Sequence, residues 1–135
     1  MNLDSLLVRR TATFHDSVIE RIELDYLKRN ACLHLQINTG DPDAEGPGER
    51  DRREAGALTI SGLLFLVMEP PDETYPYQSN EGLWIKDDEI TSQTPGISAQ
   101  LPWNLPQDAF VHRFFVDEWN SFIYVAGTHA EFAWK

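Results

Sequence analysis

The stretch that decides the fold is Arg21–Ile37, which reads Arg-Ile-Glu-Leu-Asp-Tyr-Leu-Lys-Arg-Asn-Ala-Cys-Leu-His-Leu-Gln-Ile. Apolar and polar residues alternate on both sides of the polar segment Lys28-Arg29-Asn30. A period of two residues indicates strands with one buried face, and two such runs joined by a short turn form a β-hairpin. The sequence therefore predicts an antiparallel hairpin whose apolar face carries Ile22, Leu24, Tyr26, Leu33, Leu35 and Ile37.

Further strands follow along the chain. Ala57–Met68 is expected as one strand, and its second half, Leu63–Met68, is apolar at every position. Such a run is typical of a central strand covered on both faces. Pro70 and Pro71 end it, because proline cannot donate a hydrogen bond to a neighbouring strand. The same pattern of β-branched and aromatic residues predicts strands at Val18–Tyr26, Leu83–Ile85, Phe110–Val116, Ser121–Ala126 and Ala130–Trp134.

These strands predict a mainly β fold for residues 1–135 as a single domain. Strands joined mostly by hairpins form an antiparallel sheet, here expected to curl into a small barrel or sandwich with at most one or two short helices. A chain of 135 residues can bury a core of this kind without a metal or a disulfide. Thr39–Ala55 is rich in glycine, proline and charged residues, and it is expected to be a mobile surface loop.

Charge restricts the partners. The chain has 22 acidic and 11 basic residues, which gives a formal net charge of −11. This balance argues against nucleic acid and anionic membranes, because both require a basic surface. It favours a basic protein as partner. The single cysteine, Cys32, cannot form an intrachain disulfide, and no apolar run is long enough to span a bilayer. We therefore expect a soluble, cytoplasmic protein.

His15 and Asp16 are the candidate functional pair, with two interpretations open. A hydrolase would need them to meet His34 or His129 in a cleft. Alternatively, their role is structural, and they orient the start of the first strand through backbone hydrogen bonds. Neighbouring residues of an extended strand point to opposite faces, so the two can share a site only at a bend.

The remaining motifs predict neither a metal nor a cofactor. Asp41-Pro-Asp43-Ala-Glu45-Gly46 imitates the start of a calcium loop, but Arg52 stands where the closing glutamate is required. Cys32 and His34 lack an orienting acid and an oxyanion hole. His112 shares a strand face with Phe110 and Phe114, which indicates a core histidine. We therefore favour a protein that is not an enzyme.

Three aromatic residues in proline-rich connections, Tyr75, Tyr77 and Trp103, are the candidate partner contacts, because exposed aromatics often anchor interfaces. They could instead only attach their loops to the sheet. Ala130–Trp134 could pair with a second copy as an exposed edge strand, which would give a homodimer. A further alternative is a small apolar ligand in the mouth of a barrel lined by Trp and Phe.

Phe14-His15-Asp16-Ser17, followed by an alternating strand, resembles the start of a group of small bacterial proteins of unknown function with a Phe/Leu-His-Asp-Ser/Ala motif. Leu58–Gly62 and Ser121–Ala126, followed by Ala130-Glu131-Phe132, are similar to the middle and end of those proteins. Some of them are grouped with immunity proteins of polymorphic toxin systems. The resemblance implies a non-catalytic protein-binding module, and it carries over no catalytic residues.

Overall fold

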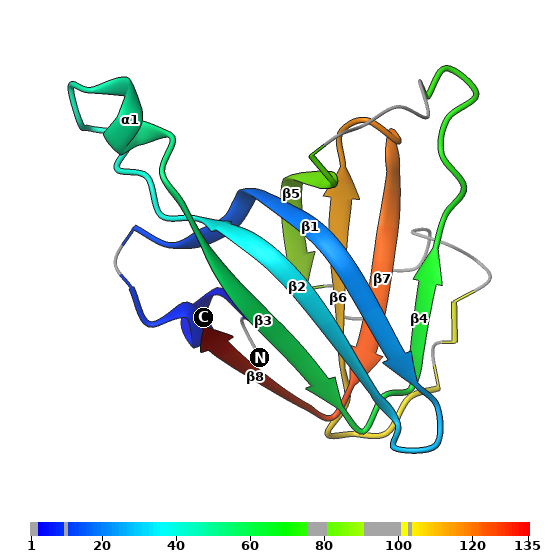
Figure 1. Cartoon of the computed structure of the whole chain (residues 1–135). Coiled ribbons are helices and arrows are strands. Elements are labelled where there is room, and N and C mark those ends of the chain that lie inside the picture. Colours follow the sequence, from blue (N-terminus) through cyan, green and yellow to red (C-terminus); the bar gives the residue numbers. More distant parts are fainter. Residues whose placement is uncertain (1–2, 10, 76–80, 91–100, 103) are drawn as a thin grey trace.

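The computed structural model describes residues 3–9, 11–75, 81–90, 101–102 and 104–135 (Figure 1). Within these ranges the strands form one antiparallel sheet in the order β4-β7-β6-β5-β1-β2-β3-β8. The sheet curls but is not closed, and β4 and β8 are its edges. The predicted mainly β fold is confirmed. The elements are η1 (Leu3–Leu7), β1 (Thr13–Asp25), β2 (Asn30–Asn38), α1 (Pro47–Arg50), β3 (Arg53–Ser61), β4 (Phe65–Met68), β5 (Leu83–Ile90), β6 (Phe110–Val116), β7 (Ser121–Gly127) and β8 (His129–Trp134).

The sheet has two halves that face each other across the core. In Figure 1, β1, β2, β3 and β8 form the half nearer the viewer, and β4 to β7 form the other. The halves are continuous where β1 pairs with β5 at Val18↔Trp84 and Ile19↔Leu83. Both halves contribute fully buried side chains, including Leu33 and Leu58 from the first and Ile123 from the second.

Aromatic rings fill part of the interior. Phe14 of β1 is fully buried, and its ring centroid lies 5.8 Å from that of Phe114, 6.3 Å from that of His112 and 6.5 Å from that of Phe132. His112 is 1% exposed, so the prediction of a core histidine is confirmed. These rings pack against one another in tilted and edge-to-face arrangements, which adds to the stabilisation from their burial.

The expected strand Ala57–Met68 is divided into β3 and β4. Gly62 has a positive φ of 57°, and a Cβ on it would lie 2.0 Å from the Thr128 hydroxyl oxygen. The chain bends there, opposite the break between β7 and β8. The prediction that Leu63–Met68 is a central strand is wrong, because β4 is an edge strand whose Val67 and Met68 are 37% and 42% exposed.

Burial differs between the two strands of the predicted hairpin. On β2, the apolar residues of the predicted face, Leu33, Leu35 and Ile37, are at most 1% exposed, as expected. On β1 the burial decreases toward the turn, because the end of the hairpin extends past the facing half of the sheet. Leu24 pairs with the buried Ala31 and so lies on the predicted face, but it is 39% exposed. Tyr26 lies beyond the end of β1 and is 75% exposed, so the prediction that both are covered is wrong.

The segment after β2 is a protruding loop, at the upper left of Figure 1. Backbone hydrogen bonds close its base, from the Thr39 N–H to the Arg52 carbonyl (2.9 Å) and from the Asp41 N–H to the Glu49 carbonyl (3.0 Å). The loop ends at Arg52, because Arg53 already begins β3. Its mobility stays a prediction. None of the helices in the described ranges is long and apolar enough to cross a membrane.

Candidate functional site

The Phe14-His15-Asp16-Ser17 segment forms an irregularity inside β1. The pairing of β1 with β2 shifts register between Thr13 and Val18, and Asp16 adopts a positive φ of 65°. Aspartate tolerates this conformation better than most residues, because its short side chain can form local hydrogen bonds. The strand therefore bends at this pair, and the bend allows the His15 Nε2 atom to lie 3.4 Å from the Asp16 carboxylate.

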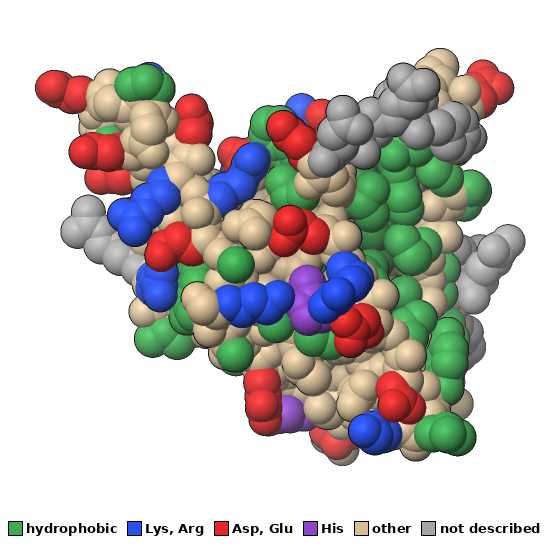
Figure 2. Space-filling view, viewed as in Figure 1, with side chains coloured by type: hydrophobic (Ala, Val, Ile, Leu, Met, Phe, Trp, Pro, Cys, Tyr) green, Lys and Arg blue, Asp and Glu red, His purple; other side chains and the backbone are tan. Residues whose placement is uncertain are grey.

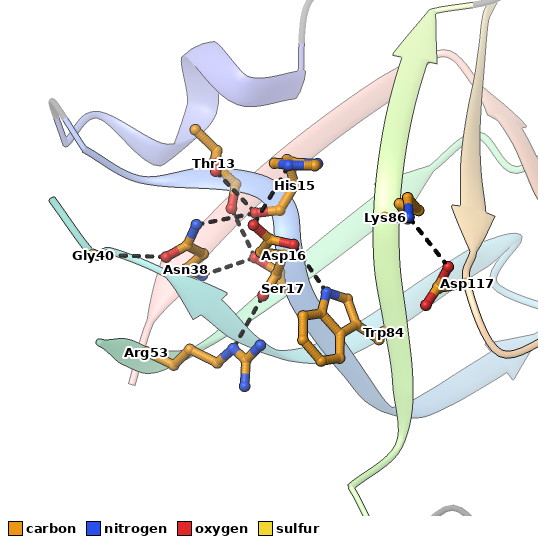
Figure 3. A network of polar contacts seen from close by, with 10 residues as sticks. All are labelled: Thr13, His15, Asp16, Ser17, Asn38, Gly40, Arg53, Trp84, Lys86 and Asp117. Atoms are coloured by element: carbon orange, nitrogen blue, oxygen red, sulfur yellow. Dashed lines mark hydrogen bonds and ion pairs between the residues drawn. The ribbon is translucent and has the colours of Figure 1, made fainter. Parts of the chain in front are cut away.

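Hydrogen bonds to the backbone hold this bulge (Figure 3). The Ser17 hydroxyl donates to the Thr13 carbonyl (2.7 Å) and accepts from the Asn38 N–H (2.8 Å). The Asn38 side-chain amide donates to the His15 carbonyl (3.2 Å), and the Arg53 Nε–H donates to the Asp16 carbonyl (3.0 Å). The backbone carbonyls of the pair are thus bound by side chains of β2 and β3, which supports the structural interpretation of the motif.

The Asp16 carboxylate binds a side chain of a neighbouring strand. It accepts a hydrogen bond from the Trp84 indole N–H of β5 (3.0 Å). The Arg53 guanidinium carbon lies 5.1 Å from the centre of the Trp84 ring, within the range of a cation–π contact. The bulge therefore fixes an indole and a guanidinium beside each other at the surface, and His15 and Trp84 stay exposed.

Ser17→Ala should destabilise the protein by about 1–3 kcal/mol, because it removes the hydroxyl that binds the partly buried Thr13 carbonyl and Asn38 N–H. Ser121→Ala is the matched control. Ser121 is also buried, but its hydroxyl finds no hydrogen-bond partner in the described part of the chain, so its loss should be neutral or stabilising. Urea denaturation of both variants measures the difference. Equal losses of stability would show that the two hydrogen bonds of Ser17 contribute nothing.

The other candidate histidines lie elsewhere. His34 contacts Glu23 (Nε2 to Oε1, 3.2 Å) and Lys135 (Nδ1 to Nζ, 2.8 Å), and His129 contacts Glu131 (3.0 Å). In the described part of the chain, the His15 ring contacts Asp16 and neither of these histidines. The arrangement required for the hydrolase interpretation is not assembled there.

The Cys32–His34 pair is likewise not arranged as a nucleophile and base. The Cys32 sulfur lies 3.6 Å from the His34 Nε2 atom, but the Glu23 carboxylate contacts that same nitrogen. In a triad the acid orients the base through the opposite ring nitrogen, and here Lys135 occupies that side. Among the residues that the structure describes, no group of three His, Cys, Asp or Glu side chains could hold a metal ion.

The tip of the β1–β2 hairpin is a second surface of interest. Leu27 is 98% exposed and Tyr26 is 75% exposed, although both are large apolar or aromatic side chains. Figure 2 shows hydrophobic side chains gathered along the flank of the molecule that carries this tip and β4. We define the apolar flank as the exposed residues of the hairpin tip, Leu24, Tyr26 and Leu27.

The hairpin tip is held in one conformation. The Asp25 carboxylate accepts hydrogen bonds from the Leu27 N–H (3.0 Å) and the Lys28 N–H (2.9 Å). Arg29 has a positive φ of 55°, and its carbonyl accepts a hydrogen bond from the Leu63 N–H (2.9 Å). The turn is thereby tied to the bend that precedes β4. The exposed side chains are therefore presented by a fixed backbone rather than by a free loop.

The predicted partner contacts lie partly outside the description. Tyr77 and Trp103 fall outside the described residues. Tyr75 is half-buried, and its ring packs edge-on against Trp119 with the centroids 6.1 Å apart. For Tyr75 this contact supports the interpretation in which the side chain attaches its loop to the sheet. β8 is an edge strand as expected, and its Trp134 indole donates to the Leu7 carbonyl of η1 (3.1 Å).

Sequence reasoning missed the exposure of the hairpin tip and the pairing of Arg53 with Trp84. A signal for the tip was present, since Tyr26 and Leu27 stand at turn positions where Gly, Asn, Asp and Ser are usual. The approach of Arg53 and Trp84 had no such signal. It depends on β1 lying between β2 and β5, which only the topology reveals.

Comparison with known proteins places the fold but not the function. The architecture defines a small, open, curled antiparallel β-sheet protein. It is similar to an uncharacterised protein from Neisseria gonorrhoeae whose crystal structure has been solved, with a TM-score of 0.53 and 15% sequence identity. The match covers 90% of this chain and 93% of that one, and at this identity it shows the fold alone. No family model matches the chain, and no curated protein matches it.

Proposed function

We propose that the chain is a non-catalytic protein-binding module that contacts its partner through the apolar flank. The observation that carries this proposal is the almost complete exposure of Leu27 beside Tyr26 on a fixed turn. A single exposed leucine is ordinary on a protein surface, whereas neighbouring large apolar side chains mark interaction sites more often.

The rigidity of the turn favours binding. Association costs the freedom of every side chain and loop that becomes ordered at the interface. The backbone of the tip is already fixed by the Asp25 carboxylate and by the Arg29–Leu63 hydrogen bond, so less freedom remains to be lost. Tyrosine is also among the residues that contribute most to binding energy in known interfaces.

The net charge of −11 favours a basic partner. Opposite charge accelerates the encounter of two proteins, and salt screens this attraction over about 10 Å at 0.1 M ionic strength. We therefore expect the association rate to fall as the salt concentration rises. The apolar contact should persist at high salt. Immunity to a basic toxin is the specific form that the sequence resemblance implies.

The test compares the wild type with Leu27→Asp and with Val8→Asp as bait for partners from the source cell, at low and at high salt. Val8 is the matched control, because it is 87% exposed and receives the same charge. It directly follows η1 and lies outside the apolar flank. A partner that uses the flank should bind Leu27→Asp at least about tenfold more weakly and Val8→Asp unchanged. Leu27→Asp should keep the wild-type melting temperature, and Val8→Asp should not lower it, because Val8 has a φ of 55° that aspartate tolerates better than valine.

Equal binding of both variants by a basic partner would remove the apolar flank from the interface. Recovery of no basic partner at low salt, together with the absence of a toxin gene nearby, would contradict the immunity form of the proposal. A Tyr26→Ala variant that also keeps full affinity would contradict the wider proposal that the tip is the contact.

A further inference from the structure

Among the residues that the structure describes, Arg53 is an arginine oriented by two contacts and without a carboxylate partner. Its Nε–H is bound to the Asp16 carbonyl, and its guanidinium lies against the Trp84 ring. Three other arginines, Arg9, Arg21 and Arg52, each form an ion pair with a glutamate. None of the ion pairs of the described residues includes Arg53. Acidic residues are twice as many as basic ones in this chain, so the difference does not come from a shortage of carboxylates.

The contacts around Arg53 that the structure describes do not use its two terminal nitrogens, which can therefore bind a ligand. Only the Nε–H is used by the bulge, and the guanidinium comes from β3 toward the bulge and the indole ring (Figure 3). The Asp16 carboxylate contacts the Trp84 indole and the His15 ring instead. A guanidinium held in this way presents its two terminal NH2 groups as a fork, which matches the two oxygens of a carboxylate.

We propose that Arg53 and Trp84 form a binding site for a carboxylate group. The terminal guanidinium nitrogens donate to both carboxylate oxygens, and the indole supports the adjoining carbon atoms by apolar contact. The site is distinct from the apolar flank and does not depend on it. The bulge at Asp16 then has a purpose beyond stability, since its carbonyl and its carboxylate orient the two residues that bind the ligand.

The test follows the indole ¹H–¹⁵N resonance of Trp84 while sodium acetate replaces sodium chloride at constant ionic strength. The resonance is assigned with Trp84→Phe. We expect a saturable shift in the wild type, its loss in Arg53→Gln and its retention in Arg21→Gln, which removes a paired arginine of the same half of the sheet. No saturable shift in the wild type, or the same shift in Arg53→Gln, would overturn the proposal.

Arg53→Lys keeps the experiment decisive if Arg53→Gln does not fold, because lysine keeps the charge but has no fork. Acetate should bind this variant several-fold more weakly, and equal affinity would overturn the proposal. Two probes then distinguish the source of the carboxylate. Tighter binding of an acetylated and amidated Gly-Glu-Gly peptide than of acetate indicates a carboxylate on a protein partner, whereas equal binding indicates a free small carboxylate. The Gly-Gln-Gly peptide should not bind, and equal binding of it would also overturn the proposal.

Discussion

Phe14→Ala is expected to lower the free energy of unfolding by about 3–5 kcal/mol, the usual cost of removing a buried aromatic ring. Phe14 is fully buried. Its ring contacts those of His112, Phe114 and Phe132, which come from both halves of the sheet. Its removal leaves a cavity where the two halves are held together. Folded domains are stable by only about 5–15 kcal/mol, so this single change removes a large share.

Urea denaturation followed by tryptophan fluorescence measures this loss. Phe14→Leu should cost clearly less, because leucine keeps much of the apolar volume. Leu27→Ala serves as the control, since a side chain that is 98% exposed should change the stability by less than about 0.5 kcal/mol. A Phe14→Ala loss no greater than that of the control would contradict the account of the core given above.

Gly62→Ala is the second change with a large expected effect. The positive φ of 57° alone costs a residue with a Cβ about 1–2 kcal/mol. The new methyl group would also meet the Thr128 hydroxyl 2.0 Å away, so the total cost should exceed that range. Gly46→Ala is the matched control, because its φ is −85° and nothing lies within 4 Å of the added Cβ.

A double-mutant cycle separates the two costs of Gly62→Ala. In a Thr128→Ala background the hydroxyl contact is removed, the Cβ of residue 128 stays 3.2 Å from the new methyl group and the backbone strain stays, so the loss of stability should shrink toward the cost of the positive φ. Chemical denaturation of the four proteins measures the coupling. Equal losses in both backgrounds would show that Thr128 yields to the methyl group without cost.

The strands that alternate along the chain could be predicted from the sequence, because alternation reports which residues face the core. β2 and β6 follow this rule closely, and the predicted ranges of β6 and β7 lie within one residue of those observed. β5 continues to Ile90, past the charged residues that were expected to end it at Ile85. Charge there did not stop the strand, because β6 pairs with it along Asp87 to Ile90.

The position of a strand in the sheet could not be predicted. The apolar run Leu63–Met68 has the composition of a central strand, yet β4 lies at the edge. Composition reports burial on average and does not determine which strand lies at the edge of the sheet. A bend at His15–Asp16 was stated only as the condition for the two to share a site, and the bonds of this bulge to Asn38 and Arg53 join segments that are distant in the chain. Such contacts follow from topology and have no local pattern.

The order of the strands also sets the order of assembly. β1, β2 and β3 are consecutive and can pair as the chain emerges, whereas the other side of β3 pairs with β8, the last strand in the sequence. Pairing across so long a loop is slow. During synthesis β3 therefore spends an interval as an open edge, and open edges attract other chains. Conditions that slow the arrival of β8 should consequently increase aggregation of the newly made protein without changing the stability of the finished fold.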